Sequence, residues 1–219
     1  MVTNTKILID HPQTRFQEIT APVFYIADFT RRTQNTSHPR SVEISVTPPT
    51  MDDGTIVDAV SFYNDKGLPI EIATFDDHIY LNTTNTNIEH CEGCLYVKDT
   101  QKWITLFEIK DCDEANIFNY RAKAIRQITN VSNDLKLRNV ITTEKVYGII
   151  SFPRKHTAFN DDIFGDIIEY THLKRTTGIL FYATNEIFIL NGYILFINNY
   201  FKFFIISIMI IIHIFLILQ

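Results

Sequence analysis

The clearest alternation of apolar and polar positions lies in the middle of the chain. Two apolar runs, residues 95–97 and 103–109, flank the polar stretch 98–102. Apolar runs joined by a short polar stretch are typical of a β-hairpin. The second run is rich in β-branched and aromatic residues, which suit a pleated, half-buried surface. The pattern therefore predicts an antiparallel hairpin whose turn centres on Thr100.

A turn at this position also fixes which side chains face each other. Glu92 is then opposite Glu108, and Lys110 is opposite His90, all on one face of the hairpin. Directly opposed carboxylates repel each other. A divalent cation between them would turn that repulsion into binding, because hard oxygen ligands suit Mg²⁺. The register predicts a polar cluster at the open end of the hairpin, and a slip of one residue would disperse it.

A long amphipathic helix and a buried strand follow the hairpin. Apolar residues recur at spacings of three and four over residues 114–137, which predicts a helix. Residues 145–152 are almost continuously apolar, as in a strand that is buried on both faces. Strand, helix and strand in this order predict a crossover connection, and hence a parallel pair of strands.

The other segments predict shorter elements. Strands are expected at 41–47, 56–63, 69–75, 78–81, 178–183 and 186–190, and a helix capped by Asn160 at 161–175. A short helix is expected at 14–19, a strand or a buried helical turn at 23–29, and a loop at 31–40. The expected fold class is α/β, a mixed β-sheet with an antiparallel hairpin, a crossover helix and flanking helices. We expect a β-rich N-terminal part at 1–67, an α/β core at 68–191 and an apolar tail at 192–219.

Charge and cysteine content bear on the binding partners and on the cellular compartment of the protein. The formal net charge is −5, which argues against wholesale non-specific binding to nucleic acid. Residues 1–118 carry 9 Lys and Arg against 18 Asp and Glu, whereas residues 119–219 carry 11 against 7. Three cysteines, an odd number, and a start without an apolar signal region favour a reducing cytoplasm.

The C-terminal tail differs in kind from the rest. From 203 to 218 the only polar side chains are Ser207 and His213. One interpretation is a membrane anchor that tethers a cytoplasmic protein, although 16 residues are slightly short for a span of about 20. The other interpretation is that the tail is translated sequence beyond the natural end of the domain. The sequence leaves both open.

The order of hairpin, Glu108-Ile109-Lys110, long helix and buried strand resembles the PD-(D/E)XK nuclease superfamily over residues 68–152. Glu108 and Lys110 match the (D/E)xK pair, and Glu92 stands for the upstream acid, which is usually Asp. Glu89, Asp76 and Asp77 are alternative acids. The resemblance implies a restriction-endonuclease-like core. It also implies metal-dependent hydrolysis of phosphodiester bonds in nucleic acid, in DNA rather than RNA.

The same resemblance assigns roles to individual residues. Glu92, Glu108 and the Ile109 carbonyl would hold Mg²⁺ or Mn²⁺, which polarises a phosphate oxygen and activates a water. Lys110 would position that water or stabilise developing charge. Gln127 on the following helix is a further catalytic candidate, and Arg126 and Lys123 are candidates for phosphate contacts.

Other interpretations compete with a nuclease. His90, Cys91, Cys94 and Cys112 would make a zinc site if Gly93 bulged the strand, or the cysteines are buried small apolar residues. The run 154–156 is either a phosphate contact or a solvated loop. The chain has no Gly-rich phosphate loop and no Gly-x-Ser-x-Gly motif, so nucleotide binding and serine hydrolysis have no support. A nuclease-like scaffold without activity, acting as a binding or assembly module, is the alternative to an enzyme.

Overall fold

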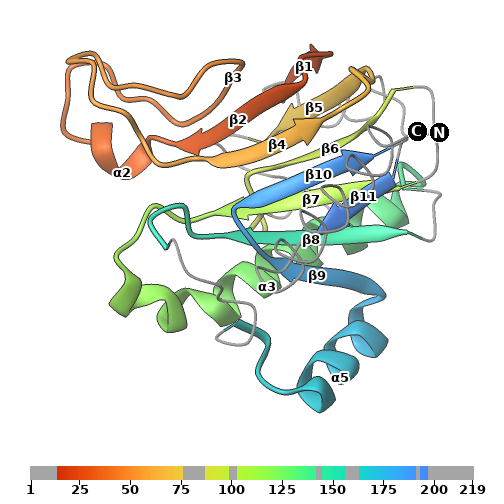
Figure 1. The fold of residues 1–219 in the computed structure, drawn as a ribbon. Coiled ribbons are helices and arrows are strands. Elements are labelled where there is room, and N and C mark those ends of the chain that lie inside the picture. The colour runs from red at the N-terminus through yellow and green to blue at the C-terminus, as the bar shows by residue number, and fades with distance from the viewer. Residues whose placement is uncertain are drawn as a thin grey trace, which may run out of the picture.

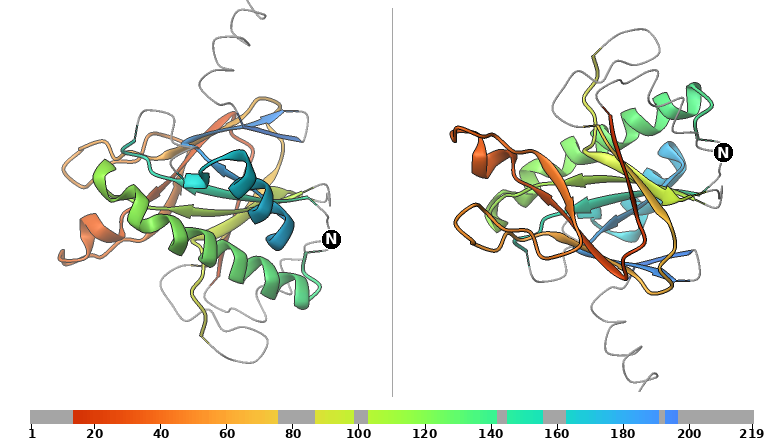
Figure 2. Two further views of the ribbon diagram at one scale, coloured as in Figure 1. Left: turned by 90° about the horizontal axis from the view of Figure 1, so that it is seen from below. Right: turned by 90° about the horizontal axis from the view of Figure 1, so that it is seen from above.

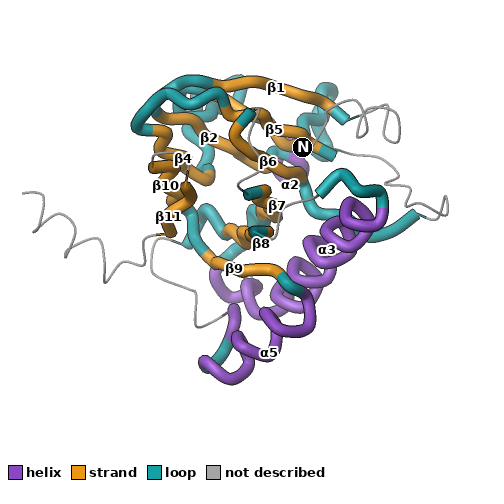
Figure 3. The backbone as a smooth tube through the Cα atoms, turned by 90° about the vertical axis from the view of Figure 1, so that its right-hand side faces the viewer, coloured by secondary structure: helices purple, strands orange, loops and turns teal. Residues whose placement is uncertain are grey.

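The computed structural model describes residues 14–75, 87–98, 103–141, 145–155, 163–190 and 193–196. These residues form two mixed sheets and a layer of helices (Figure 1). One face of the six-stranded sheet is covered by α3 and α5, and the five-stranded sheet lies on its other face (Figures 2 and 3). The chain is therefore mixed α/β, as the sequence predicts.

The six-stranded sheet has the order β1-β5-β6-β7-β8-β9. Its strands span Arg15–Ile19, Ile70–Thr74, Gly93–Val97, Ile104–Ile109, Val146–Ser151 and Ile179–Ala183. β1, β5, β6 and β7 pair antiparallel, and β7, β8 and β9 pair parallel. Every residue of β6 and β7 is buried, because these strands occupy the middle of the sheet between two layers.

The five-stranded sheet has the order β11-β10-β4-β2-β3. Its strands span Tyr193–Phe196, Glu186–Leu190, Val60–Asn64, Val23–Asp28 and Val42–Ser45. β4 pairs parallel with β10, while β1 joins the other sheet. The described part of the N-terminal segment, residues 14–67, therefore contributes strands to both sheets.

The predicted hairpin and its register are confirmed. Gly93 pairs with Phe107 and Cys94 with Leu106, as a turn centred on Thr100 requires. The Glu92 N–H donates to the Phe107 carbonyl over 3.1 Å, so the ladder continues to the position where Glu92 faces Glu108. Both faces of the hairpin strands are buried, including the face that carries Glu108.

The crossover connection is also confirmed. A short 3₁₀ turn at Glu114–Asn116 leads into α3, Ile117–Leu137, and β7 and β8 are parallel. A Cβ on Gly148 of β8 would lie 3.1 Å from Ile128 Cγ2 of α3, so Gly148 faces the helices. Leu106 is the register partner of Gly148, and Glu108 lies two residues further along β7. By alternation, Glu108 faces the helix layer too.

Several other expectations are corrected or lie outside the described residues. The helix expected at 14–19 is instead the strand β1, because pairing with β5 satisfies the backbone groups of this segment. The expected loop at 31–40 begins within a short helix, α2, Thr30–Thr33. The expected second helix is α5, Ile167–Thr177, which Asp166 caps through the N–H groups of Ile168 and Glu169. The predicted strand 78–81, the cap Asn160 and the tail 203–218 lie outside the described residues.

Candidate functional site

Glu92, Glu108 and Lys110 meet at one end of the six-stranded sheet. The Lys110 Nζ lies 2.6 Å from Glu108 Oε1 and 3.4 Å from Glu92 Oε1, so one ammonium bridges two carboxylates. The Glu108 side chain is completely buried, while Glu92 and Lys110 keep 20% and 18% of their side-chain surface. The cluster therefore meets solvent through Glu92 and Lys110, with Glu108 beneath them.

The Glu108 carboxylate is poorly satisfied for a buried group. Within the described part of the chain, neither of its oxygens has a hydrogen-bond partner. The close contact with Lys110 is therefore an ion pair without good hydrogen-bond alignment. Buried polar atoms in folded proteins usually have partners, and exceptions often mark a function or a bound ion. Glu108 is thus the side chain in this cluster with the most unused capacity to accept a ligand.

Burial raises the pKa values of both glutamate carboxyl groups, so both favour the protonated form. Burial raises the pKa of Glu92 to about 8, and the charge of Glu108 adds to the effect. Burial also raises the pKa of Glu108, to about 7, although the charge of Lys110 opposes the rise. Asp28, at the end of β2, adds further negative charge nearby. Near neutral pH, the metal-free pair therefore shares a proton.

Lys110 stays charged in this environment. Its burial alone would lower the pKa of the ammonium, but the charges of Glu108 and Glu92 outweigh burial and raise the pKa. A fully ionised cluster of two carboxylates and one ammonium carries a net charge of −1. An additional cation would therefore be attracted to the cluster.

Gln127 contacts the segment that precedes Glu92. Its Nε2 donates to the His90 carbonyl over 2.6 Å, and its Oε1 is buried without a hydrogen-bond partner among the described residues. Asn130, also on α3, donates to the Glu89 carbonyl over 3.2 Å. These contacts tie α3 to the segment that leads into Glu92, so the observed contact of Gln127 is a positioning one.

Glu89 and the phosphate candidates Arg126 and Arg154 form ion pairs of their own. Glu89 is about half exposed and pairs with Arg126, with 2.6 Å between the Glu89 Oε2 and the Arg126 Nε. Asp76 and Asp77 lie outside the described residues. Arg154 donates to the carboxylates of Asp111 and Asp113, and 31% of its side-chain surface stays exposed.

The cysteines are buried thiols. Cys91, Cys94 and Cys112 are all free and buried. Burial raises the pKa of Cys91 well above its usual value and that of Cys94 to about 12, whereas zinc binds the thiolate. In the described part of the chain, no three His, Cys, Asp or Glu side chains come together as a metal-binding group. The arrangement favours the interpretation of the cysteines as small apolar residues.

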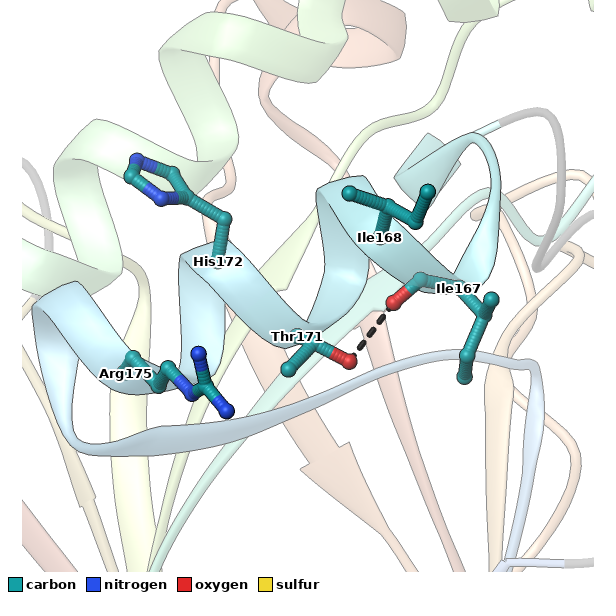
Figure 4. Close-up of a pocket in the computed structure, with 5 residues that line it drawn as sticks. All are labelled: Ile167, Ile168, Thr171, His172 and Arg175. Atoms are coloured by element: carbon teal, nitrogen blue, oxygen red, sulfur yellow. Dashed lines mark hydrogen bonds between the residues drawn. The ribbon is translucent and has the colours of Figure 1, made fainter.

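A hollow of about 310 Å³ is lined by side chains of α5 (Figure 4). Its lining is Ile167, Ile168, Thr171, His172 and Arg175. The Thr171 hydroxyl donates to the Ile167 carbonyl within the same helix. A single histidine and arginine beside exposed isoleucines do not make a catalytic group, so we do not place the site there.

Sequence reasoning finds the cluster but misses its surroundings. Asp111, the residue after Lys110, has only 5% of its side chain exposed and contacts both Arg32 and Arg154. An aspartate directly after a (D/E)xK pair is the signal in the sequence that could have drawn attention to this position. Its two arginine partners come from distant segments, which no local pattern connects.

Comparison with known proteins gives no family for this chain, so the functional assignment rests on the geometry of the site. Among the described residues, none of the helices has the length and apolar character needed to cross a membrane. No protein-family model, curated protein or solved structure matches the chain.

Proposed function

We propose that the chain is a metal-dependent phosphodiesterase of the nuclease type, acting on nucleic acid, DNA rather than RNA. The observation that carries the proposal is the bridge of Lys110 between Glu92 and Glu108. The cluster lies where β7 ends and the crossover to α3 begins. The antiparallel β6–β7 pair, the helix and the parallel strand β8 support the proposed restriction-endonuclease-like core.

The residues at the cluster fit a divalent cation. Glu108 offers two buried oxygens that lack hydrogen-bond partners among the described residues, and the facing Glu92 keeps 20% of its side-chain surface exposed. Mg²⁺ in proteins is commonly held by one or two carboxylates, with waters and substrate phosphates completing its shell. We therefore propose Glu92, Glu108 and the Ile109 carbonyl as ligands for Mg²⁺ or Mn²⁺.

Bound there, the ion would supply Lewis-acid activation of a phosphate oxygen and of a water. Lys110 carries a fixed positive charge with donors that can orient the attacking water and stabilise charge that develops on the phosphate. Glu92 and Glu108 must give up the proton they share before both can act as ligands, so ion binding and proton release are linked. Gln127 contributes by holding the His90 carbonyl and thereby the segment that carries Glu92.

We also propose that the protein acts in the cytoplasm and contacts a membrane through residues 203–218. The support is the sequence of that segment, which has Ser207 and His213 as its only polar side chains. A tethered protein would partition with membranes when cells are fractionated. A variant that ends at residue 196 would lose that partitioning if the tail is the tether.

A second candidate, a binding or assembly module without activity, has one observation in its favour. Glu108 is fully buried under a lysine that already neutralises part of its charge. An ion cluster of this kind can be part of a fold without any chemical role, and removing one of its partners is then destabilising. The two candidates differ at Lys110, because turnover depends on that ammonium, whereas binding to a protein partner does not.

The proposal is tested with purified full-length protein and plasmid or single-stranded DNA, in Mg²⁺, Mn²⁺ or EDTA. Glu108→Gln is compared with Glu43→Gln, a glutamate on β3 that pairs with Arg40. We expect cutting that requires the metal, disappears in Glu108→Gln and persists in Glu43→Gln. Absence of cutting on every substrate, or cutting that Glu108→Gln leaves intact, would exclude the nuclease and leave the binding module.

A further inference from the structure

Asp111, directly after Lys110, is held from two sides by arginines. Arg32 of α2 donates from Nε to Oδ2 over 2.8 Å and from Nη2 to Oδ1 over 3.2 Å. Arg154, which follows β8, donates from Nε to Oδ1 over 2.5 Å and from Nη2 to Oδ2 over 3.1 Å. Each guanidinium therefore meets the carboxylate as a two-pronged fork, which is the strongest geometry for this pair.

The arginines of this clamp, Arg32-Asp111-Arg154, are held in place themselves. Arg154 also donates to Asp113 Oδ1 over 2.6 Å, and Arg32 lies 3.6 Å from Asp58 Oδ2. Burial alone would raise the pKa of Asp111, but hydrogen bonds from Arg154 and Arg32 outweigh burial and lower it. Asp111 thus stays ionised, and the clamp persists at neutral pH.

The loop that carries Arg154 has a further anchor. Asn185, between β9 and β10, accepts from the Phe152 N–H over 3.1 Å and donates to the Lys155 carbonyl over 2.8 Å. The Asn185 carbonyl in turn accepts from the Ser61 N–H of β4 over 2.9 Å. The clamp is therefore connected through this loop to the five-stranded sheet.

The clamp fixes Asp111, which directly follows the proposed catalytic residue Lys110. The Lys110 N–H donates to the Ser151 carbonyl and the Lys110 carbonyl accepts from the Cys112 N–H, both over 2.9 Å. These bonds and the fixed Asp111 immobilise the backbone on both sides of Lys110. Lysine has a long, flexible stem, and its Nζ must reach two carboxylates at once. A displacement of about 1 Å at a catalytic group can cost about 100-fold in rate.

We propose that Asp111, held by Arg32 and Arg154, is a positioning residue that keeps the Lys110 ammonium between Glu92 and Glu108. Its meaning for catalysis rests on the proposed function, but the placement of Lys110 can be measured without any activity. The clamp would also transmit movements of α2 and of the loop after β8 to the lysine.

The first test measures how readily Lys110 is acylated. The full-length protein is treated with an N-hydroxysuccinimide ester, and the modification of each lysine is quantified by mass spectrometry. Asp111→Asn should raise the labelling of Lys110 by about fivefold relative to Lys98, because a freed ammonium loses its ion pairs. Asp134→Asn is the matched control, since Asp134 is as buried and pairs with Arg138 at the end of α3. It should leave the ratio unchanged.

The second test uses a double-mutant cycle on cleavage. Asp111→Asn should lower kcat by about 10- to 100-fold with little change in KM, and should have no further effect in a Lys110→Met background. If Asp111→Asn fails to fold, Arg32→Lys replaces it, because this variant keeps the charge but loses the fork.

The outcomes separate this inference from the proposed function. Labelling of Lys110 that stays unchanged in a folded clamp variant overturns the positioning role, whether or not the protein cuts nucleic acid. If Lys110 is labelled more strongly in the clamp variant but the wild-type protein cuts no nucleic acid, the positioning role is supported and the nuclease function is excluded. An equal loss of kcat in the wild-type and Lys110→Met backgrounds would show that Asp111 acts independently of Lys110, which also overturns the inference.

Discussion

The two buried carboxyls should make the metal-free protein less stable as pH rises. The pKa of Glu92 is about 8 and that of Glu108 about 7 in the folded protein, because both are buried and the charge of Glu108 also acts on Glu92. Their usual value is 4.5. Between these values the folded protein holds protons that the unfolded chain has lost, so folding is favoured by low pH. The contribution to stability is retained below about pH 4.5 and is lost as pH rises to about 8.

Glu92→Gln isolates this effect, because glutamine keeps the shape and removes the ionisation. The difference between 4.5 and about 8 corresponds to at most about 5 kcal/mol of unfolding free energy. We expect about 2–4 kcal/mol, because the two carboxyls share one proton and the substitution leaves Glu108 free to ionise beside Lys110. Relative to wild type, Glu92→Gln should therefore become progressively more stable from about pH 5 to about pH 8.

The assay is urea unfolding of the full-length protein in EDTA, at several pH values in this range. Glu89→Gln is the control, because Glu89 lies three residues away but is exposed, and its pair with Arg126 lowers its pKa. This variant should show no gain in stability as pH rises. Parallel pH profiles for wild type and Glu92→Gln would refute the idea that the cluster holds a proton against ionisation.

Three further predictions concern the surroundings of the cluster. Gly93→Ala should destabilise the protein by about 1–3 kcal/mol in thermal melts, because its Cβ would clash with the backbone Ala73 carbonyl oxygen and lie 2.6 Å from the Phe107 Cζ. An unchanged melting temperature would contradict this prediction. Gln127→Met should lower the free energy of unfolding by about 1–3 kcal/mol, because it removes the donor to the His90 carbonyl. Hydrogen exchange of the native protein should then be faster at the start of β6, and equal exchange in both proteins would count against the positioning contact. Native mass spectrometry should find no stoichiometric zinc, since burial keeps the Cys-x-x-Cys thiols protonated, and one zinc per chain would reverse that assignment.

The hairpin can be predicted from the sequence because its information is local. A short polar stretch between two apolar runs leaves few registers that bury both strands, and the pairing of Cys94 with Leu106 follows from it. The long helix and the parallel strand after it are predictable for a similar reason, since periodicity is read within each segment.

Pairings between distant segments are beyond such reasoning. The sequence of residues 14–19 is compatible with a helix, yet pairing with β5 makes this segment a strand. Nothing in the apolar pattern of β4 indicates its parallel pairing with β10, far along the chain. Predicting it requires knowing the tertiary context of the strands, which the β-propensity of one segment does not give.

At the candidate site, too, local contacts can be predicted from the sequence and contacts between distant segments cannot. Glu92, Glu108 and Lys110 are predicted as neighbours because they lie in one hairpin, and the structure brings them together. The complete burial of Glu108 is not predicted, because it depends on the layer of helices above the sheet. Asp111 is missed because its partners, Arg32 and Arg154, come from a helix and a loop that meet only in the folded chain.

The most direct test of the account is the effect of Lys110→Met on metal-dependent cleavage. Lys98→Met is the matched control, because Lys98 also forms an ion pair, with its Nζ 2.6 Å from Glu18 Oε2, at the same sheet. Both variants are compared with wild type under saturating Mg²⁺, after urea unfolding has shown that all three are folded. The account predicts that Lys110→Met loses cleavage by about 100-fold or more while Lys98→Met keeps it. Equal cleavage by the two variants would contradict a catalytic role for the Glu92-Glu108-Lys110 cluster.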